Sequence, residues 1–152
     1  MSNTHISNSK WKKGIYKPLN PHKYKGGDAI IFRSRWEYKM MRFLDLNENV
    51  LEWISERPLI PYLNPVTQTT WNYHPDFVIK LKTQSGYVVQ MLEVKPYKQT
   101  IAPKVTPGKR QKTILTEAQN WAVNKAKWAA AKNYCDSRGW EFKILTEKEL
   151  FV

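Results

Sequence analysis

Two short apolar segments joined by a polar turn constrain the fold of this chain more than any other feature. Residues 77–81 and 87–92 are rich in β-branched and aromatic side chains, which is typical of β-strands. The four residues between them, Thr83-Gln84-Ser85-Gly86, have the length and composition of a hairpin connection. The sequence therefore predicts an antiparallel hairpin, and we expect its turn to centre between Gln84 and Ser85.

This turn sets which residues of the two strands face each other. With that centre, Val78 is expected opposite Met91, and Asp76 opposite Glu93. Directly opposed residues share a face, with Cβ atoms roughly 4.5–5.5 Å apart, and the period of a strand puts Lys95 on the face of Glu93. Two carboxylates so close repel each other unless a proton or a cation lies between them. The hairpin therefore predicts a site with oxygen ligands for a hard divalent cation.

The same residues have a simpler interpretation, in which the acids are ordinary charges on an exposed hairpin face and Lys95 neutralises one of them. The neighbours of Glu93 favour the metal site, because Leu92 and Val94 place this acid near the inside of a sheet. An acid in such surroundings needs a partner. A shift of the register by one residue would turn Glu93 away from Asp76 and remove the site.

Composition and charge indicate one folded domain with a polyanionic partner. The 152 residues suffice for one hydrophobic core. The formal net charge of +12 favours nucleic acid as the partner, ahead of an anionic membrane. No apolar run is long enough to span a membrane, the N-terminus lacks the apolar region of a secretory signal, and Cys135 is the lone cysteine. We expect an intracellular protein that is neither secreted nor inserted in a membrane.

The positive charge is concentrated in the first third of the chain. Up to Arg42 there are ten basic residues and two acidic ones, Asp28 and Glu37. Residues 1–29 also carry few aliphatic side chains, so we expect an extended basic arm ahead of a single domain over residues 30–152. The aromatic residues of this arm either stack on bases or anchor the arm to a surface, or they are incidental residues of a solvated tail.

A first helix is predicted to begin near Ser34, because Ser34 and Glu37 have the spacing of a capping box. Its apolar residues recur at helical spacing and form the expected buried face: Trp36, Met40, Phe43 and Leu44. Glu37 has two candidate roles, which are closing the cap and adding a further acid beside the metal. Residues 50–62 then predict one short strand near a sheet edge, because prolines lack the ladder donor.

A basic segment follows the hairpin. Residues 97–112 contain five basic residues and no acidic one, namely Lys98, Lys104, Lys109, Arg110 and Lys112. Such a charge run is either a solvated face or a clamp for the phosphate backbone, and its position after Lys95 favours the clamp. We include Arg33 and Arg35 among the expected DNA contacts.

A second capping-box pattern at Thr116 predicts a long helix that ends near Arg138, with Gly139 after it. A heptad of bulky residues predicts its packed face: Trp121, Trp128 and Cys135. A polar stripe faces either solvent or DNA, and it comprises Asn120, Asn124 and Lys127. Residues 140–145 predict a last strand, and Thr146 is expected to cap a terminal helical turn.

Several motifs in this chain resemble known nucleases. Pro75-Asp76 and Glu93-Val94-Lys95 resemble the Pro-Asp…Glu-X-Lys signature of the restriction-endonuclease-like nucleases. Further segments, in the same order over roughly residues 10–150, resemble the head completion nucleases of T-even-like tailed bacteriophages: residues 23–28, 33–37, 52–56, 59–62, 93–96, 124–128 and 138–147. Similar elements occur in the nuclease subunit of cut-and-paste transposons.

The resemblance implies an α/β fold with a restriction-endonuclease-like core, in which helices flank a mixed central sheet. It implies an Mg²⁺-dependent DNA endonuclease, in which Mn²⁺ can substitute. Asp76, Glu93 and Glu37 would be metal ligands, and Lys95 would lie near the attacking water. The implied biological role is to finish the packaged phage head, with double-stranded DNA as the substrate and the portal or neck as docking partners. The implied location is the host cytoplasm or the virion.

We expect cleavage with little sequence preference, because no segment has the pattern of a dedicated base-reading helix. The sequence leaves the oligomeric state open, together with three alternative functions. The first is a structural protein of the virion head or neck that retains the nuclease fold. The second is a DNA-binding module without cleavage, and the third is a transposase-type subunit that cleaves DNA ends.

Overall fold

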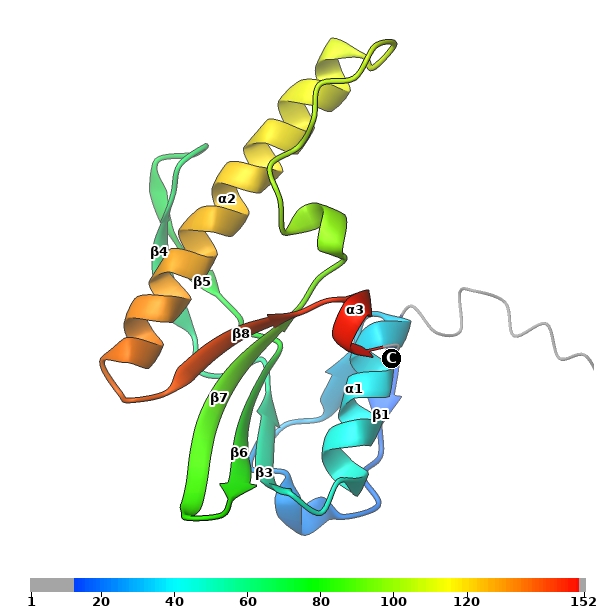
Figure 1. Cartoon of the computed structure of the whole chain (residues 1–152), viewed down its shortest axis with the longest axis vertical. Helices are drawn as coiled ribbons and strands as arrows, with labels where there is room; N and C mark the ends of the chain where they lie inside the picture. The colour runs from blue at the N-terminus through cyan, green and yellow to red at the C-terminus, as the bar shows by residue number, and fades with distance from the viewer. Residues whose placement is uncertain (1–12, 151–152) are drawn as a thin grey trace, which may run out of the picture.

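A four-stranded mixed sheet forms the centre of the protein in a computed structural model, which describes residues 13–150 (Figure 1). Its strands, in sheet order, are β3 (Val50–Ser55), β6 (Phe77–Thr83), β7 (Gly86–Val94) and β8 (Glu141–Leu145). The first three are antiparallel neighbours, whereas β8 runs parallel to β7. The predicted α/β fold with a mixed central sheet is confirmed.

The β6–β7 hairpin has the predicted register. Val78 pairs with Met91, and the turn between the strands consists of Gln84 and Ser85. A connection of two residues leaves the strands little freedom to slip against each other. The ladder ends at the pair Phe77 and Leu92, so the next residue of each strand, Asp76 or Glu93, lies at this end of the hairpin.

Two helices cover opposite faces of this sheet. Helix α1 (Arg35–Leu46) belongs to the hydrophobic cluster that contains Phe77, and helix α2 (Gln111–Asp136) belongs to the cluster that contains Val78 and Met91. Successive side chains of a strand point to opposite faces, so each strand contributes to both clusters. The side of the sheet covered by α2 is also the side of Glu93, two residues beyond Met91.

Helix α1 begins at the predicted cap. The Oγ atom of Ser34 accepts a hydrogen bond from the backbone N–H of Glu37, 3.1 Å away. The Glu37 carboxylate in turn accepts from the backbone N–H of Arg33 at 2.9 Å. The predicted buried face is wrong at Phe43, which is 53% exposed. The helix instead turns Asp45 inward, because this carboxylate is bound by the N-terminal segment.

Residues 13–29 pack against the domain, where an extended arm was expected. Strand β1 (Gly14–Tyr16) pairs with β2 (Ile30–Phe32), and the buried Tyr16 donates a hydrogen bond to Asp45 at 2.7 Å. Lys23 follows β1 in the short helix η2 (Pro21–Lys23). Its buried ammonium donates to three backbone carbonyl oxygens at the end of α1, those of Leu44, Asp45 and Asn47.

The aromatic residues of this segment anchor it to the core. The ring of Tyr24 packs on Trp53 with a centroid distance of 4.7 Å, and Tyr16 is 7% exposed. Neither ring is therefore placed to stack on DNA bases. The first twelve residues of the expected arm lie outside the described part of the chain.

Two strands replace the single strand predicted between residues 50 and 62. Strand β3 lies at the edge of the central sheet, as expected, but β4 (Ile60–Asn64) pairs with β5 (Thr69–Tyr73) in a separate hairpin. Pro61 lies in this two-stranded ribbon, where a missing donor can face the side without a neighbouring strand. The ribbon packs beside α2 (Figure 1). Its Tyr73 belongs to the same hydrophobic cluster as Val78 and Met91 of the central hairpin.

Helix α2 begins before the predicted capping box, and that prediction is wrong. Thr116 lies inside the helix, where its hydroxyl donates to the carbonyl oxygen of Lys112 at 2.9 Å. The helix ends at Asp136, and Gly139 follows with a φ of +69°, a conformation that favours glycine. The first half of α2 projects beyond the sheet. The segment between η3 (Tyr97–Gln99) and α2 lies alongside this half of the helix (Figure 1).

The chain closes with the predicted strand β8 and the short helix α3 (Glu147–Leu150). The Oγ1 atom of Thr146 accepts from the backbone N–H of Lys148 at 3.2 Å, and the Glu149 carboxylate accepts from the N–H of Thr146 at 2.6 Å. The predicted cap of this helix is confirmed. None of the helices within residues 13–150 combines the length and the apolar character that a membrane crossing requires.

Candidate active site

Asp76 is tied to the strand that carries Glu93. The Oδ2 atom of Asp76 accepts a hydrogen bond from the backbone N–H of Val94 at 2.7 Å. Burial, and next the charge of Glu93, raise the pKa of Asp76 well above its usual range. The two acids therefore lie within reach of each other's charge, as the hairpin register predicts.

Glu93 is held from two sides by residues of other elements. The residue is almost fully buried, at 5% exposure. The Tyr73 hydroxyl donates a short hydrogen bond to Oε2 of Glu93, and Oε1 lies 3.8 Å from the ammonium nitrogen of Lys95. Burial raises the pKa of Glu93, whereas the bond from Tyr73 and the charge of Lys95 oppose this rise.

Two lysines stand beside the acids. Lys95 follows β7 directly, and Lys127 reaches the same place from the middle of α2. Burial, and then the charge of Lys95, lower the pKa of Lys127, while Glu93 and Asp76 oppose this shift. Of the polar stripe on α2, Lys127 therefore lies beside the carboxylates and does not simply face solvent.

Glu37 contributes to the same electrostatic cluster from α1. Its charge is one of the causes that raise the pKa of Asp76. Its carboxylate also accepts the hydrogen bond from the backbone N–H of Arg33. The side chain therefore takes part in the helix cap and lies within electrostatic reach of Asp76, and its role as a metal ligand stays a prediction.

The donor set suits a hard divalent cation. A buried carboxylate pair with raised pKa values is relieved when a cation lies between the two charges. Within residues 13–150, no three histidine, cysteine, aspartate or glutamate residues are grouped closely enough to hold a metal by themselves. Mg²⁺ typically keeps several waters and binds through one or two carboxylates plus substrate phosphates, so Asp76 and Glu93 fit this ion.

Two residues of the site were missed in the sequence. Tyr73 ends β5, in a segment for which the sequence predicts no site residue. Trp128 was assigned to a packed helix face, yet it lies beside Glu93 and helps to lower the pKa of that acid. Its indole N–H is buried without a partner in acceptable hydrogen-bond geometry among the described residues. The available signal for Trp128 was its position directly after Lys127.

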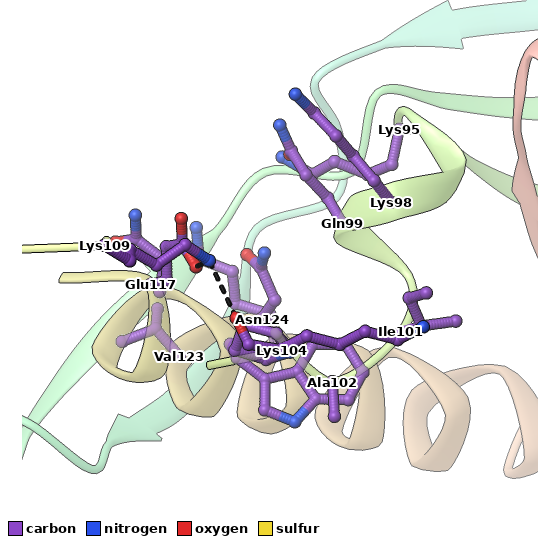
Figure 2. A pocket seen from close by; sticks show the side chains of 14 residues that line it. Lys95, Lys98, Gln99, Ile101, Ala102, Lys104, Lys109, Glu117, Val123 and Asn124 are labelled. Atoms are coloured by element: carbon purple, nitrogen blue, oxygen red, sulfur yellow. Dashed lines mark hydrogen bonds and ion pairs between the residues drawn. The ribbon is translucent and has the colours of Figure 1, made fainter. Parts of the chain in front are cut away.

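A cleft of about 750 Å³ opens next to the carboxylates, between residues 95–109 and α2 (Figure 2). Five of the predicted DNA-contacting residues line it, namely Lys98, Lys104, Lys109, Asn124 and Lys127. The ammonium group of Lys109 donates to Glu117 and to the carbonyl oxygen of Lys104, at 2.8 Å each. Lys109 therefore fastens the loop to the helix at one end of the cleft, while Lys95 and Lys98 lie at the other end (Figure 2).

The other predicted DNA contacts lie outside the cleft. Arg110 and Lys112 are exposed at the start of α2. Arg33 forms an ion pair with Glu56, and Arg35 is the first residue of α1. The structure therefore separates these four basic residues from the cleft, and their contact with DNA stays a prediction.

Comparison with known proteins agrees with this geometry. The family model described as "TnsA-like endonuclease N terminal" matches residues 47–147, a span that contains Asp76, Glu93, Lys95 and Lys127. The chain is 36% identical over 142 residues to the "Head completion nuclease" of Enterobacteria phage T4, and the match covers 90% of this chain and 92% of that protein. The predicted resemblance is confirmed. The chain therefore belongs to the TnsA-like endonuclease family, with a restriction-endonuclease-like fold, and is a DNA endonuclease similar to the T4 head completion nuclease.

Proposed function

We propose that this endonuclease depends on Mg²⁺, cleaves double-stranded DNA with little sequence preference, and acts when the phage head is completed after packaging. Mn²⁺ would substitute for Mg²⁺. The observation that carries the proposal is the buried pair of Asp76 and Glu93, whose pKa values are both raised and which lies next to Lys95. The similarity to the T4 protein supports the role in head completion.

Asp76 and Glu93 would hold the cation, with Glu37 as a further acid. When bound, Mg²⁺ polarises the phosphoryl group, lowers the pKa of a bound water and stabilises the leaving oxygen. One oxygen of each carboxylate is already held by the protein, Oδ2 of Asp76 by the Val94 N–H and Oε2 of Glu93 by Tyr73. These bonds orient both carboxylates before the cation arrives, which is the preorganisation that catalysis requires.

Lys95 and Lys127 would act on the phosphate and the attacking water. Lys95 would orient that water or offset the negative charge that develops on the phosphoryl group. Lys127 has a lowered pKa because it is desolvated beside another ammonium group. A phosphate at this place would stabilise both ammonium groups, since opposite charge favours the protonated form.

Low sequence preference follows from the kind of contacts that the cleft offers. Lysine contacts to phosphate oxygens position a protein on DNA but carry no sequence information. The basic residues of the loop and of α2 that line the cleft are lysines, which would make contacts of this kind. The T4 relative is named for head completion, so we propose docking of this chain to the portal or neck, in the infected host cell or in the virion.

Cleavage of supercoiled and linear duplex DNA in Mg²⁺ or Mn²⁺ tests the proposed function. Asp76→Asn is expected to abolish cleavage and Lys95→Ala to lower it strongly, while circular dichroism shows that both variants are folded. Asp136→Asn and Lys143→Ala change the same residue types at exposed positions and serve as matched controls. Activity that persists in a chelator, or in Asp76→Asn, would contradict the proposal. DNA binding without cleavage in any metal would instead support a structural head or neck protein.

The family match also favours a second candidate, a transposase-type subunit that cleaves at DNA ends. Mapping the cut positions on linear DNA separates the two. Cuts spread over the interior of the duplex support cleavage with low preference, whereas cuts confined to one short site or to defined ends support the second candidate.

A further inference from the structure

The cleft is lined by aromatic and amide side chains as well as by the lysines that would bind phosphate. Besides five lysines, its walls include Asn120, Trp121 and Asn124 of α2. Trp121 is half-buried, and its ring packs edge-on against Trp128 with a centroid distance of 6.2 Å. Since Trp128 lies beside Glu93, the two indoles form a continuous aromatic path from the carboxylates into the cleft.

The charge around this path is positive. Lys125 stands one helical turn after Trp121, with its ammonium nitrogen 5.9 Å from the centre of that ring. Among the described residues that line the cleft, Glu117 is the only acid, and it is bound by Lys109. A positively charged groove with an aromatic platform is the combination that binds single-stranded nucleic acid without sequence preference.

A continuous duplex cannot use this platform. Bases in a duplex are stacked on one another and present only their edges in the grooves. The cleft, at about 750 Å³, has the size of a pocket for a small ligand. The matching occupant is therefore one strand, a nucleotide or a few at a time, with its phosphates on the lysines and a base against Trp121.

We propose that the cleft binds an unpaired DNA strand and leads it to Asp76 and Glu93, so that flaps, overhangs and branches are preferred over continuous duplex. The proposal rests on the endonuclease function and names its substrate class. Asn120 and Asn124 supply amides that can bond to base edges along the path. Lys95 and Lys127 lie where the strand would reach the carboxylates.

Binding without metal tests the cleft separately from catalysis. Fluorescence anisotropy in a chelator would compare a labelled oligothymidylate of about 12 nucleotides with a blunt duplex. Trp121→Leu is expected to weaken oligothymidylate binding by about 5- to 150-fold, and Trp121→Phe to restore most of it. Trp71→Leu removes a tryptophan that is 52% exposed on β5, outside the cleft, and is expected to change neither affinity.

Cleavage in Mg²⁺ provides the second measurement. A duplex with a single-stranded flap is expected to be cut faster than a blunt duplex, and Trp121→Leu is expected to lower this ratio. The proposal is overturned if Trp121→Leu binds oligothymidylate with the affinity of the wild type. It is also overturned if the substitution lowers the affinities for oligothymidylate and for blunt duplex by the same factor, even where cleavage is normal. Loss of single-strand binding in Trp121→Leu supports the cleft assignment even if no substrate is cleaved, a result that would contradict only the endonuclease proposal.

Discussion

Removal of one hydroxyl group, by Tyr73→Phe, tests how the site controls the charge of Glu93. Tyr73 is 3% exposed, and its hydroxyl donates to Oε2 of Glu93. Burial and the charge of Glu93 raise the pKa of Tyr73 far above its ordinary value, so the group remains a donor at every working pH. The substitution keeps the ring and removes only this donor.

The size of the effect follows from the bond that is lost. A hydrogen bond to a charged group contributes about 1.5–3 kcal/mol, and about 1.4 kcal/mol corresponds to one pH unit of titration. Protons compete with the metal for the carboxylate, so activity is expected to rise as pH passes the raised pKa of Glu93. Tyr73→Phe should move this acidic limb of the pH–rate profile upward by about 1–2 pH units.

Stability without metal changes in the matching direction. A carboxyl group whose pKa is raised in the folded state favours folding at low pH, and this contribution is lost as pH rises through the raised pKa. The missing donor costs most where Glu93 is charged, because a hydrogen bond to a carboxylate is stronger than one to a neutral carboxyl group. Tyr73→Phe is therefore expected to cost about 1.5–3 kcal/mol near pH 8 and less near pH 5.

Initial rates of plasmid nicking between about pH 5 and pH 9, at saturating Mg²⁺, measure the shift. Tyr16→Phe is the matched control, because it removes a buried tyrosine donor to Asp45, on the other face of the sheet. The control should lose stability and keep its pH–rate profile. A profile of Tyr73→Phe that superimposes on the wild type would refute the reasoning, as would an equal shift in Tyr16→Phe.

Three further predictions concern other residues of the structure. Ser34→Ala removes the N-cap bond of α1 and is expected to cost about 1 kcal/mol while cleavage is retained, whereas Glu37→Gln is expected to lower cleavage. Urea denaturation beside a nicking assay separates the two, and equal loss of cleavage in both variants would contradict a catalytic role for Glu37. Lys95→Ala is expected to reduce kcat by about 10²- to 10³-fold, and a loss confined to KM would show that Lys95 only binds substrate. Burial raises the pKa of Cys135 to about 11, so a thiol reagent near pH 8 should react only on unfolding. Rapid labelling of the native protein would show that the contact of Cys135 with Met91 opens readily.

The placement of Asp76 next to Glu93 was predictable because a short turn determines it. Two residues connect β6 to β7, and this connection places Asp76 next to Glu93 without any tertiary information. The cap of α1 was equally local, since Ser34 and Glu37 are one helical turn apart. Patterns that span three or four residues therefore predict structure where it depends on the local backbone alone.

The supporting residues were not predictable in this way. Tyr73 and Trp128 reach Glu93 from a separate hairpin and from the opposite helix, so their positions depend on how whole elements pack. Thr116 is a residue type that often caps a helix, but here it lies inside α2 and its hydroxyl donates to the carbonyl oxygen of Lys112, one turn earlier. The segment around Tyr16 looked too polar to fold alone, and it is folded because Asp45 and Trp53 bind it.

Helix α2 is supported by the sheet over only part of its length. Ala131 and Cys135 are fully buried, whereas Leu115 is 59% exposed on the half that projects from the domain (Figure 1). Opening free energies follow the number of buried contacts, so backbone amides should exchange with solvent slowly around Cys135 and quickly before Trp121. Lys127 lies between the buried turns around Cys135 and the more exposed turns that form the wall of the cleft. Binding of a DNA strand in the cleft should then slow amide exchange in the turns before Trp121 and leave exchange around Cys135 unchanged.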